Sequence, residues 1–271
     1  MSKLSFDPKL FYSSYPEKVI LRPGYPARAQ FKSTLLWNLY GNSIIQQLGE
    51  IKTYADIAGC FGFGANAMAF HISQVQGYYP DTKVFEISPD FITKGKLLFP
   101  YIDFIQDEFD KWTGTPLVFD LVTLFDALEH IPKPQAFLST LSLHTKYALL
   151  KTPMETTGEW RGSRPPAKQG ENHSDGHVNF FTPKSYVAML EESNFEIVKE
   201  RLVRSIIPYG SMSILAPEVA LPKSKLKRIA IQLARRILSH PMLPYSLPRK
   251  ILGDGDHLCL VRSKSKFIVQ S

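Results

Sequence analysis

Short apolar runs alternate with longer amphipathic stretches along most of this chain. The runs predict strands at residues 54–58, 83–87, 104–105, 121–125, 147–150, 196–198 and 256–262. Helical stretches separate most of them, and this alternation is typical of βα units, which build a parallel sheet. The pattern therefore predicts an α/β fold in which helices cover both faces of a seven-stranded, mostly parallel sheet.

An amphipathic helix is predicted ahead of the first strand. Apolar side chains recur at spacings of three and four within residues 31–48, as a helix with one buried face requires. Residues 1–28 are rich in proline and tyrosine, which favours an irregular arm. We therefore divide the chain into an arm and cap helix (1–50), a main domain (51–205), and an insertion with the closing strand of that domain (206–271).

The composition is that of a soluble globular protein, with 44% hydrophobic and 21% charged residues. The chain shows neither the apolar run of a signal peptide nor the roughly 20 apolar residues of a membrane span, so a cytoplasmic protein is expected. Cys60 and Cys259 are its two cysteines. They predict two free thiols and no structural metal.

Positive charge is concentrated towards the C-terminus. Residues 201–271 hold 13 of the 32 Lys and Arg residues but only 3 of the 25 Asp and Glu residues. Within this region, residues 225–239 predict a basic amphipathic helix. Its apolar stripe either packs on the main domain, or the segment 223–240 makes a peripheral contact with acidic membrane lipids.

A turn of small residues follows the first predicted strand. The stretch Asp56-Ile57-Ala58-Gly59-Cys60-Phe61-Gly62 joins this strand to a helix, and small side chains there let the backbone approach a ligand closely. Glu86 ends the next strand. At the carboxyl edge of a parallel sheet, that carboxylate can accept hydrogen bonds from both hydroxyls of a ribose.

Four motifs in this order resemble those of the class I S-adenosylmethionine-dependent methyltransferases, most closely the small-molecule group that includes the ubiquinone-biosynthesis O-methyltransferases. They are the 56–62 turn, Glu86, and the segments 119–132 and 177–183. The resemblance covers residues 50–205. It implies a Rossmann-like domain that binds S-adenosylmethionine and transfers its methyl group.

The same resemblance implies a set of cofactor contacts, with Asp56 orienting the turn and Gly59 and Gly62 beneath the methionine end of the cofactor. Asp107 would meet the adenine amino group, unless it is a solvated acid beside Glu108. The full set is Asp56, Ala58, Gly59, Cys60, Gly62, Glu86, Ile87, Asp107 and Phe125.

The turn departs from the family pattern at two positions, because Ala58 and Cys60 stand where glycine is usual. Both side chains are tolerated if the backbone φ angles are negative. A positive φ at either position costs about 1 kcal/mol or more. The departure favours weaker cofactor binding than is usual for the family.

Three histidines are candidates for the base that removes a proton from an acceptor hydroxyl. His130 follows Glu129 after the fourth strand, where spacing places Asp126 on the same face of a helical turn; His173 and His177 lie in a polar loop after the fifth strand. Each also has a structural interpretation, in which Glu129 and His130 brace the turn and His177 holds the loop.

No metal ion is expected in that loop. Glu171 and Asp175 are ligand types beside the two histidines, but they do not form a tight closed set.

The expected partner is a small-molecule or sugar acceptor. Arg161 and Arg164 favour an acidic acceptor, and the basic helix favours a lipid-linked one. Ala58 and Cys60 leave open a catalytically silent binding or scaffold protein.

A nucleic-acid methyltransferase is the third function considered, because the isoelectric point is near 9.2. Base-modifying enzymes of this fold usually carry an Asn/Asp-Pro-Pro-aromatic sequence after the fourth strand. This chain has Phe125-Asp126-Ala127-Leu128 there, so a nucleic-acid partner is disfavoured.

Overall fold

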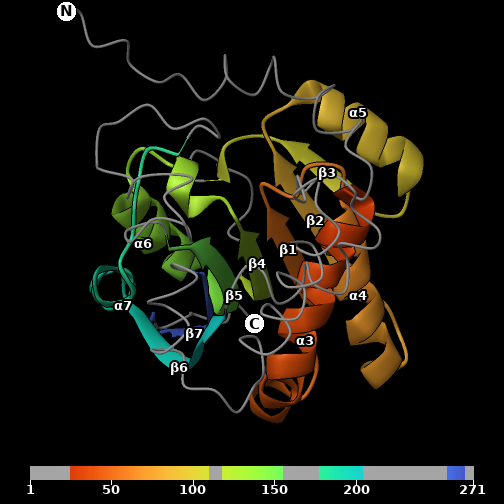
Figure 1. Ribbon diagram of the computed structural model, residues 1–271. Coiled ribbons are helices and arrows are strands. Elements are labelled where there is room, and N and C mark those ends of the chain that lie inside the picture. The colour runs from red at the N-terminus through yellow and green to blue at the C-terminus, as the bar shows by residue number, and fades with distance from the viewer. Residues whose placement is uncertain (1–24, 110–117, 155–176, 204–254, 266–271) are drawn as a thin grey trace, which may run out of the picture.

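A seven-stranded sheet forms the centre of the computed structural model, which describes residues 25–109, 118–154, 177–203 and 255–265 (Figure 1). Its strands are β1 (Thr53–Ile57), β2 (Asp81–Glu86), β3 (Asp103–Gln106), β4 (Phe119–Phe125), β5 (Thr145–Pro153), β6 (Phe195–Val203) and β7 (Asp256–Ser263). The described helices are α3 (Tyr25–Leu48), α4 (Phe63–Gln76), α5 (Pro89–Leu98), α6 (Pro134–His144) and α7 (Pro183–Glu192), together with the 3₁₀ turn η2 (Leu128–His130).

The strands lie in the order β3-β2-β1-β4-β5-β7-β6. β1 to β5 pair in parallel, whereas β7 runs antiparallel to both of its neighbours. The chain therefore moves outward from β1 to β3, returns to β4, and continues in the other direction. In open α/β sheets, ligands bind beyond the carboxyl ends of the strands where the strand order reverses. That point lies here between β1 and β4, and the predicted Rossmann-like fold is confirmed.

Two apolar cores cover the two faces of the sheet. In Figure 1, α6 and α7 lie on one side of the sheet and α3, α4 and α5 on the other. Alternate residues of each strand point to opposite faces, so neighbours such as Leu258 and Cys259 belong to different cores. The first core includes Phe137, Leu141, Tyr186 and Leu190, and the second includes Leu36, Ile44, Met68 and Ile72.

Helix α3 begins at Tyr25, six residues before the predicted start at residue 31. The prediction of an irregular chain as far as residue 28 is wrong there, because Pro26 lies in the first turn, where proline removes no helical hydrogen bond. The helix is tied down at two points. The Ser33 hydroxyl donates to the Gly64 carbonyl at 2.8 Å, and the Tyr40 hydroxyl donates to the Leu258 carbonyl at 3.1 Å.

Several predicted features lie outside the described residues. They are the arm 1–24, the loop residues Arg161, Arg164 and His173, and the basic segment 223–240. Among the described helices, none combines the length and apolar character needed to cross a membrane.

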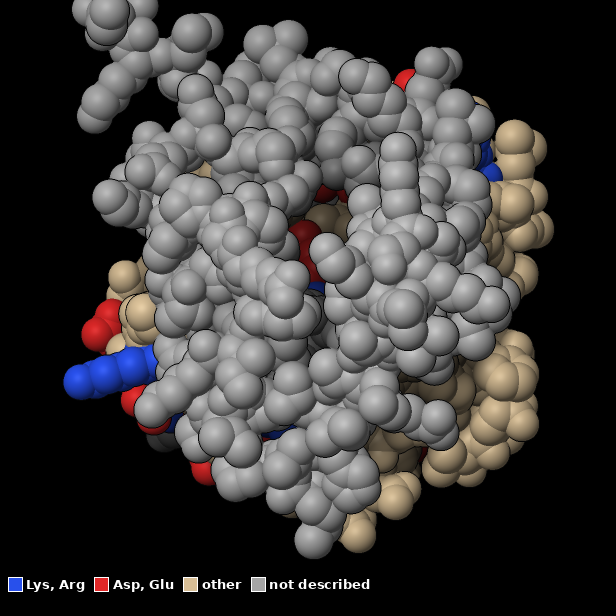
Figure 2. Space-filling model, viewed as in Figure 1, with Lys and Arg blue, Asp and Glu red and all other residues tan. Residues whose placement is uncertain are grey.

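The visible described surface over α4 and α5, on the right of Figure 2, is formed mainly by uncharged residues. Charged side chains project on the left, over α6 and α7, and others are visible in a hollow near the middle of this face. The described surface therefore carries no continuous basic patch in this view.

Candidate active site

The turn after β1 has an unusual left-handed backbone. Ala58 has a φ of 56°, Cys60 a φ of 51°, and Gly62 a φ of 80°. Only glycine adopts this region without steric cost, because a Cβ atom crowds the following carbonyl oxygen. Both departures from the family pattern therefore fall at positions where glycine is favoured, and the turn stores strain.

Gly59 is required for a different reason. A Cβ atom placed on it would lie 2.8 Å from Asp56 Oδ2 and 3.0 Å from Val84 Cγ1, both too close. The turn thus passes close over the Asp56 carboxyl group. Asp56 Oδ1 accepts a hydrogen bond of 2.7 Å from the Thr123 hydroxyl, which lies 2.7 Å from the Tyr54 hydroxyl.

Asp56 is buried beneath this turn, with 5% of its surface exposed. Burial raises the pKa of its carboxyl group to about 7, although the Thr123 hydrogen bond works against the shift. Asp56 is therefore largely protonated below neutral pH. The Asp56 carboxyl group is then neutral, and Glu86 is the other acidic residue beside the turn, at the end of β2.

Glu86 ends β2 beside the turn, as predicted. Its Oε2 accepts the backbone N–H of Cys60 at 3.0 Å, and its Oε1 accepts those of Ile87 and Ser88 at 2.8 and 2.9 Å. Burial raises the pKa of Glu86, and the three backbone donors oppose that shift. A carboxylate has about four acceptor positions. Three are used, so this geometry leaves room for one ligand hydrogen bond where the sequence predicted two.

The remaining predicted cofactor residues surround the same edge of the sheet. Ile87 follows β2 and Phe125 ends β4, and both are half-buried. Asp107 follows β3, and its Oδ1 accepts the backbone N–H of Glu108 at 2.8 Å. That bond fits the structural interpretation of Asp107, and its contact with adenine stays a prediction.

Aromatic side chains pack beside the turn. Tyr25, the first residue of α3, meets Phe61 edge-on with ring centroids 5.8 Å apart, and Phe61 packs on Phe91 of α5 at 4.5 Å. Burial raises the pKa of Tyr25. The sequence pattern did not predict this aromatic contact, because it placed Tyr25 in an irregular arm.

A series of ion pairs lies at the sheet edge next to the turn. Asp126, which follows β4, pairs with Lys32 of α3 and Lys151 of β5, and Lys151 Nζ lies 2.9 Å from Asp256 Oδ1. Burial raises the pKa of Asp126, but the charges of Lys151 and Lys32 outweigh it and hold that pKa below its usual range. These ion pairs join α3, the segment after β4, and the strands β5 and β7.

The position predicted for Asp126 is wrong. The sequence placed it on one face with Glu129 and His130, whereas its carboxylate binds the two lysines. The reason is local, because Asp126 has a φ of 51° and the helical turn η2 starts only at Leu128. No sequence signal paired the lysines with it, since the partners lie 94 and 25 residues away.

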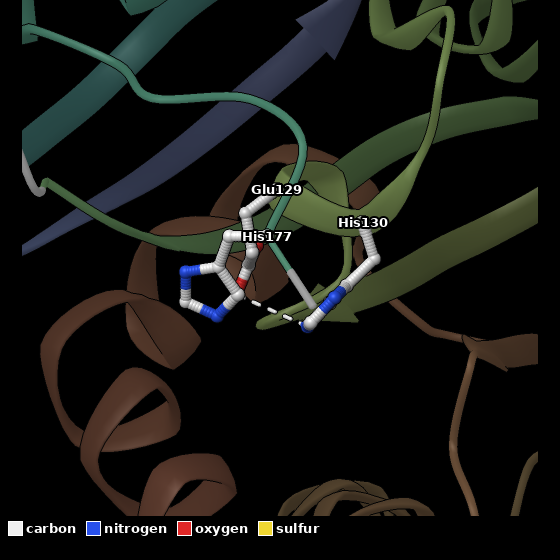
Figure 3. A group of neighbouring side chains, drawn as sticks. All are labelled: Glu129, His130 and His177. Carbon is white, nitrogen blue, oxygen red and sulfur yellow. Dashed lines mark ion pairs between the residues drawn. The ribbon is translucent and has the colours of Figure 1, made fainter. Parts of the chain in front are cut away.

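Glu129, His130 and His177 come together beyond β4 (Figure 3). Glu129 Oε1 lies 3.9 Å from His130 Nε2, and the two imidazole rings meet edge-on with centroids 4.8 Å apart. Glu129 is 1% exposed, and its Oε2 has no hydrogen-bond partner. Burial, followed by the charge of Asp126, raises the pKa of Glu129 well above its usual value. A buried carboxyl group with a raised pKa thus lies beside two imidazoles.

Residues 177–179 are clamped onto this turn. The backbone N–H groups of Val178 and Asn179 donate to the Glu129 carbonyl at 2.8 and 3.1 Å. The Asn179 side-chain amide donates to the carbonyls of Leu128 and Ile131 at 3.0 and 2.6 Å. These bonds fix His177 beside His130. Asn179 lies in the 177–183 segment, whose sequence gives no sign of this clamp.

A family model for the methyltransferase domain matches residues 61–200. The match begins after Ala58 and Cys60, where the sequence departs from the family. No curated protein matches the sequence.

Similar solved structures cover about 85% of the chain. The cyclase SpnF has a TM-score of 0.53 at 12% identity, over 86% of this chain and 82% of its own. A S-adenosylmethionine-dependent methyltransferase from Clostridium acetobutylicum has a TM-score of 0.52 at 8% identity, over 85% and 92%. At such identities the likeness shows the fold alone, and neither comparison tests the ubiquinone-type subgroup.

Relief of the backbone strain should stabilise the protein. Ala58 is exposed, so Ala58→Gly removes no packing; it relieves about 1–2 kcal/mol of strain and adds about 0.4–1 kcal/mol of unfolded-chain entropy. We expect a net gain of about 0.5–1 kcal/mol in the free energy of unfolding, measured by urea denaturation. The control Ala67→Gly lies in helix α4 and should lose about 1 kcal/mol. Destabilisation by Ala58→Gly would contradict the left-handed turn.

The buried Asp56 should make stability depend on pH. Its pKa is about 7 in the folded protein and about 4 unfolded, so the folded state binds more protons between these values and stability falls as pH rises through this window. Asp56→Asn removes that loss, which is at most about 4 kcal/mol. We expect the variant to gain on the wild type from pH 4 to pH 8 in urea denaturation. A difference that is constant across this range would show that Asp56 keeps an ordinary pKa.

Proposed function

We propose that this chain transfers a methyl group from S-adenosylmethionine to a hydroxyl oxygen of a small-molecule or sugar acceptor. The chain belongs to the family of methyltransferase domains. The donor and the methyl transfer follow from the family. The acceptor class and the oxygen are the proposal. The observation that carries it is the buried Glu129 carboxyl group beside His130 and His177, at the carboxyl edge of β4.

The residues of this edge fit the donor. Glu86 keeps one acceptor position for a ribose hydroxyl, and the backbone of the 58–62 turn would hold the methionine end. Ile87, Phe125 and Asp107 would line the adenosine. The bound donor supplies a methyl group already activated by a sulfonium, so the protein needs no covalent intermediate.

The chain then has two tasks, which are to position the acceptor oxygen in line with the methyl carbon and to take its proton. His130 or His177 would accept the proton of the acceptor hydroxyl as its oxygen takes the methyl group, and the bound donor would supply that methyl group and leave as a neutral thioether. The buried Glu129 carboxyl group, with its Oε1 3.9 Å from His130 Nε2, would hold the imidazole of His130 in position beside the acceptor.

A catalytically silent binding protein is the second candidate. The left-handed Ala58 and Cys60 favour it, because side chains occupy the turn where the backbone would approach the donor. The same fold also serves proteins with other functions, so architecture alone does not decide between the two. Transfer of a labelled methyl group distinguishes them.

Methyl transfer to oxygen is tested with S-adenosylmethionine carrying a carbon-13 methyl group. Incubation with a fractionated small-molecule extract should give a product whose methyl carbon-13 shift identifies attachment to oxygen, and alkali should not release it as it releases an ester. Attachment to nitrogen or sulfur would overturn the proposed acceptor. Absence of any product, despite donor binding, would favour the silent protein.

Removal of the base should slow chemistry without weakening donor binding. We expect His130→Ala or His177→Ala to lower kcat by about 100-fold or more, the usual contribution of a general base. Calorimetry with S-adenosylhomocysteine should give an unchanged Kd for the same variant. His71→Ala, on α4, is a matched control that should keep kcat. Full turnover by both variants from pH 6 to pH 9 would exclude a histidine base at this site.

A further inference from the structure

A second cluster of ligating side chains lies on the other half of the sheet. Glu200 of β6 and His257 and Cys259 of β7 each place one ligating atom so that all three lie within 4.8 Å of one another. The His257 Nε2 atom is 2.8 Å from Glu200 Oε2. His257 is 2% exposed and Cys259 is fully buried, whereas half of the Glu200 side chain is exposed. The cluster is therefore closed on one side and open to solvent on the other.

A β-bulge brings Glu200 to this cluster. Ile197 stands opposite Val261, but Lys199 stands opposite Leu260, so one extra residue of β6 separates them. Without this bulge, Glu200 would stand opposite Leu258 and face α3. With it, Glu200 stands opposite Cys259 and faces the same side of the sheet as that thiol. Bulges that redirect a side chain in this way are common beside functional sites.

The imidazole of His257 lacks a hydrogen-bond partner on one side. Its Nδ1 atom is buried and makes no hydrogen bond, and the ring packs on that of Tyr186 with centroids 5.2 Å apart. A buried polar atom without a partner costs about 1–3 kcal/mol. Nδ1 lies on the side of the ring away from Nε2, so an ion shared with Glu200 would bind through Nε2.

We propose that Glu200, His257 and Cys259 bind a zinc ion. Thiolate and imidazole together select zinc over magnesium or calcium, and zinc takes four ligands, so water completes the set. Zinc–ligand distances of about 2.0–2.3 Å place tetrahedral ligands roughly 3.3–3.7 Å apart. The 2.8 Å pair of His257 Nε2 and Glu200 Oε2 would have to open by about 0.5–1 Å to reach that geometry, and the half-exposed Glu200 side chain can make this movement.

The ion would have a structural role. Binding displaces the thiol proton of Cys259 to solvent and links the edge strand β6 to β7, against which it pairs along its whole length. This inference does not rest on the proposed methyl transfer. It departs from the sequence prediction of two free thiols, because the ligands come from two strands and the bulge that aligns them has no sequence signature.

Zinc and cobalt titrations of the whole chain test the proposal. We expect one zinc ion per chain by calorimetry, and cobalt should give the near-ultraviolet charge-transfer absorption of a thiolate ligand. Cys259→Ser should abolish that absorption, and Glu200→Gln should weaken zinc binding by more than about 100-fold, beyond the usual effect of residues that only support a ligand. The matched controls Cys60→Ser and Glu196→Gln should leave both signals unchanged.

Three results would overturn the site. The first is that the wild type binds no zinc, and the second is that the thiolate absorption survives in Cys259→Ser. The third is that zinc binds without any thiolate absorption and that this zinc binding is lost in His177→Ala. The last would assign the ion to Glu129, His130 and His177 instead. Cys259 lies in the core, so Cys259→Ser carries a risk of misfolding. The half-exposed Glu200→Gln and the cobalt spectrum of the wild type decide the question in that case.

Discussion

The parallel pairing of β1 with β4 is the constraint on which the rest of this molecule depends. It reverses the strand order at the centre of the sheet and brings two carboxyl ends together, with Ile57 opposite Leu124. The turn that follows β1 and the segment that follows β4 must then share one edge. The same pairing lets the Thr123 hydroxyl reach Asp56, so the carboxyl group under the turn is fixed by the neighbouring strand rather than by the turn itself.

Several tertiary contacts hold this edge rigid although its backbone is strained. Helix α3 reaches across it, with Lys32 bound to Asp126 and the Ser33 hydroxyl bound to the Gly64 carbonyl at the start of α4. Left-handed conformations outside glycine persist only where surrounding structure determines them. Ala58 and Asp126 are such positions, one beside the expected donor and one beside the expected acceptor. The contacts of α3 with Asp126 and Gly64 lie beside these two positions.

The sequence predicted the fold well because the strands of a sheet covered on both faces are short apolar runs, which are visible without an alignment. It also placed Glu86 at the end of the second strand, whereas the donor contacts of Glu86 and Gly59 stay predictions. It could not predict the ion pairs of Lys151 or the clamp formed by Asn179, because those depend on tertiary distances. The predicted start of α3 was too late, because proline usually ends a helix. Pro26 does not, since it lies in the first turn.

Glu86 and the turn it braces form the proposed donor site. Calorimetric titration of S-adenosylhomocysteine into the wild type and into Glu86→Ala tests this site most directly, with Asp81→Ala, an exposed acid at the other end of β2, as the control. We expect a loss of about 2 kcal/mol or more in the binding free energy of Glu86→Ala, which is roughly 30-fold in Kd, and no change in the control. Unchanged affinity in a folded Glu86→Ala variant would contradict it.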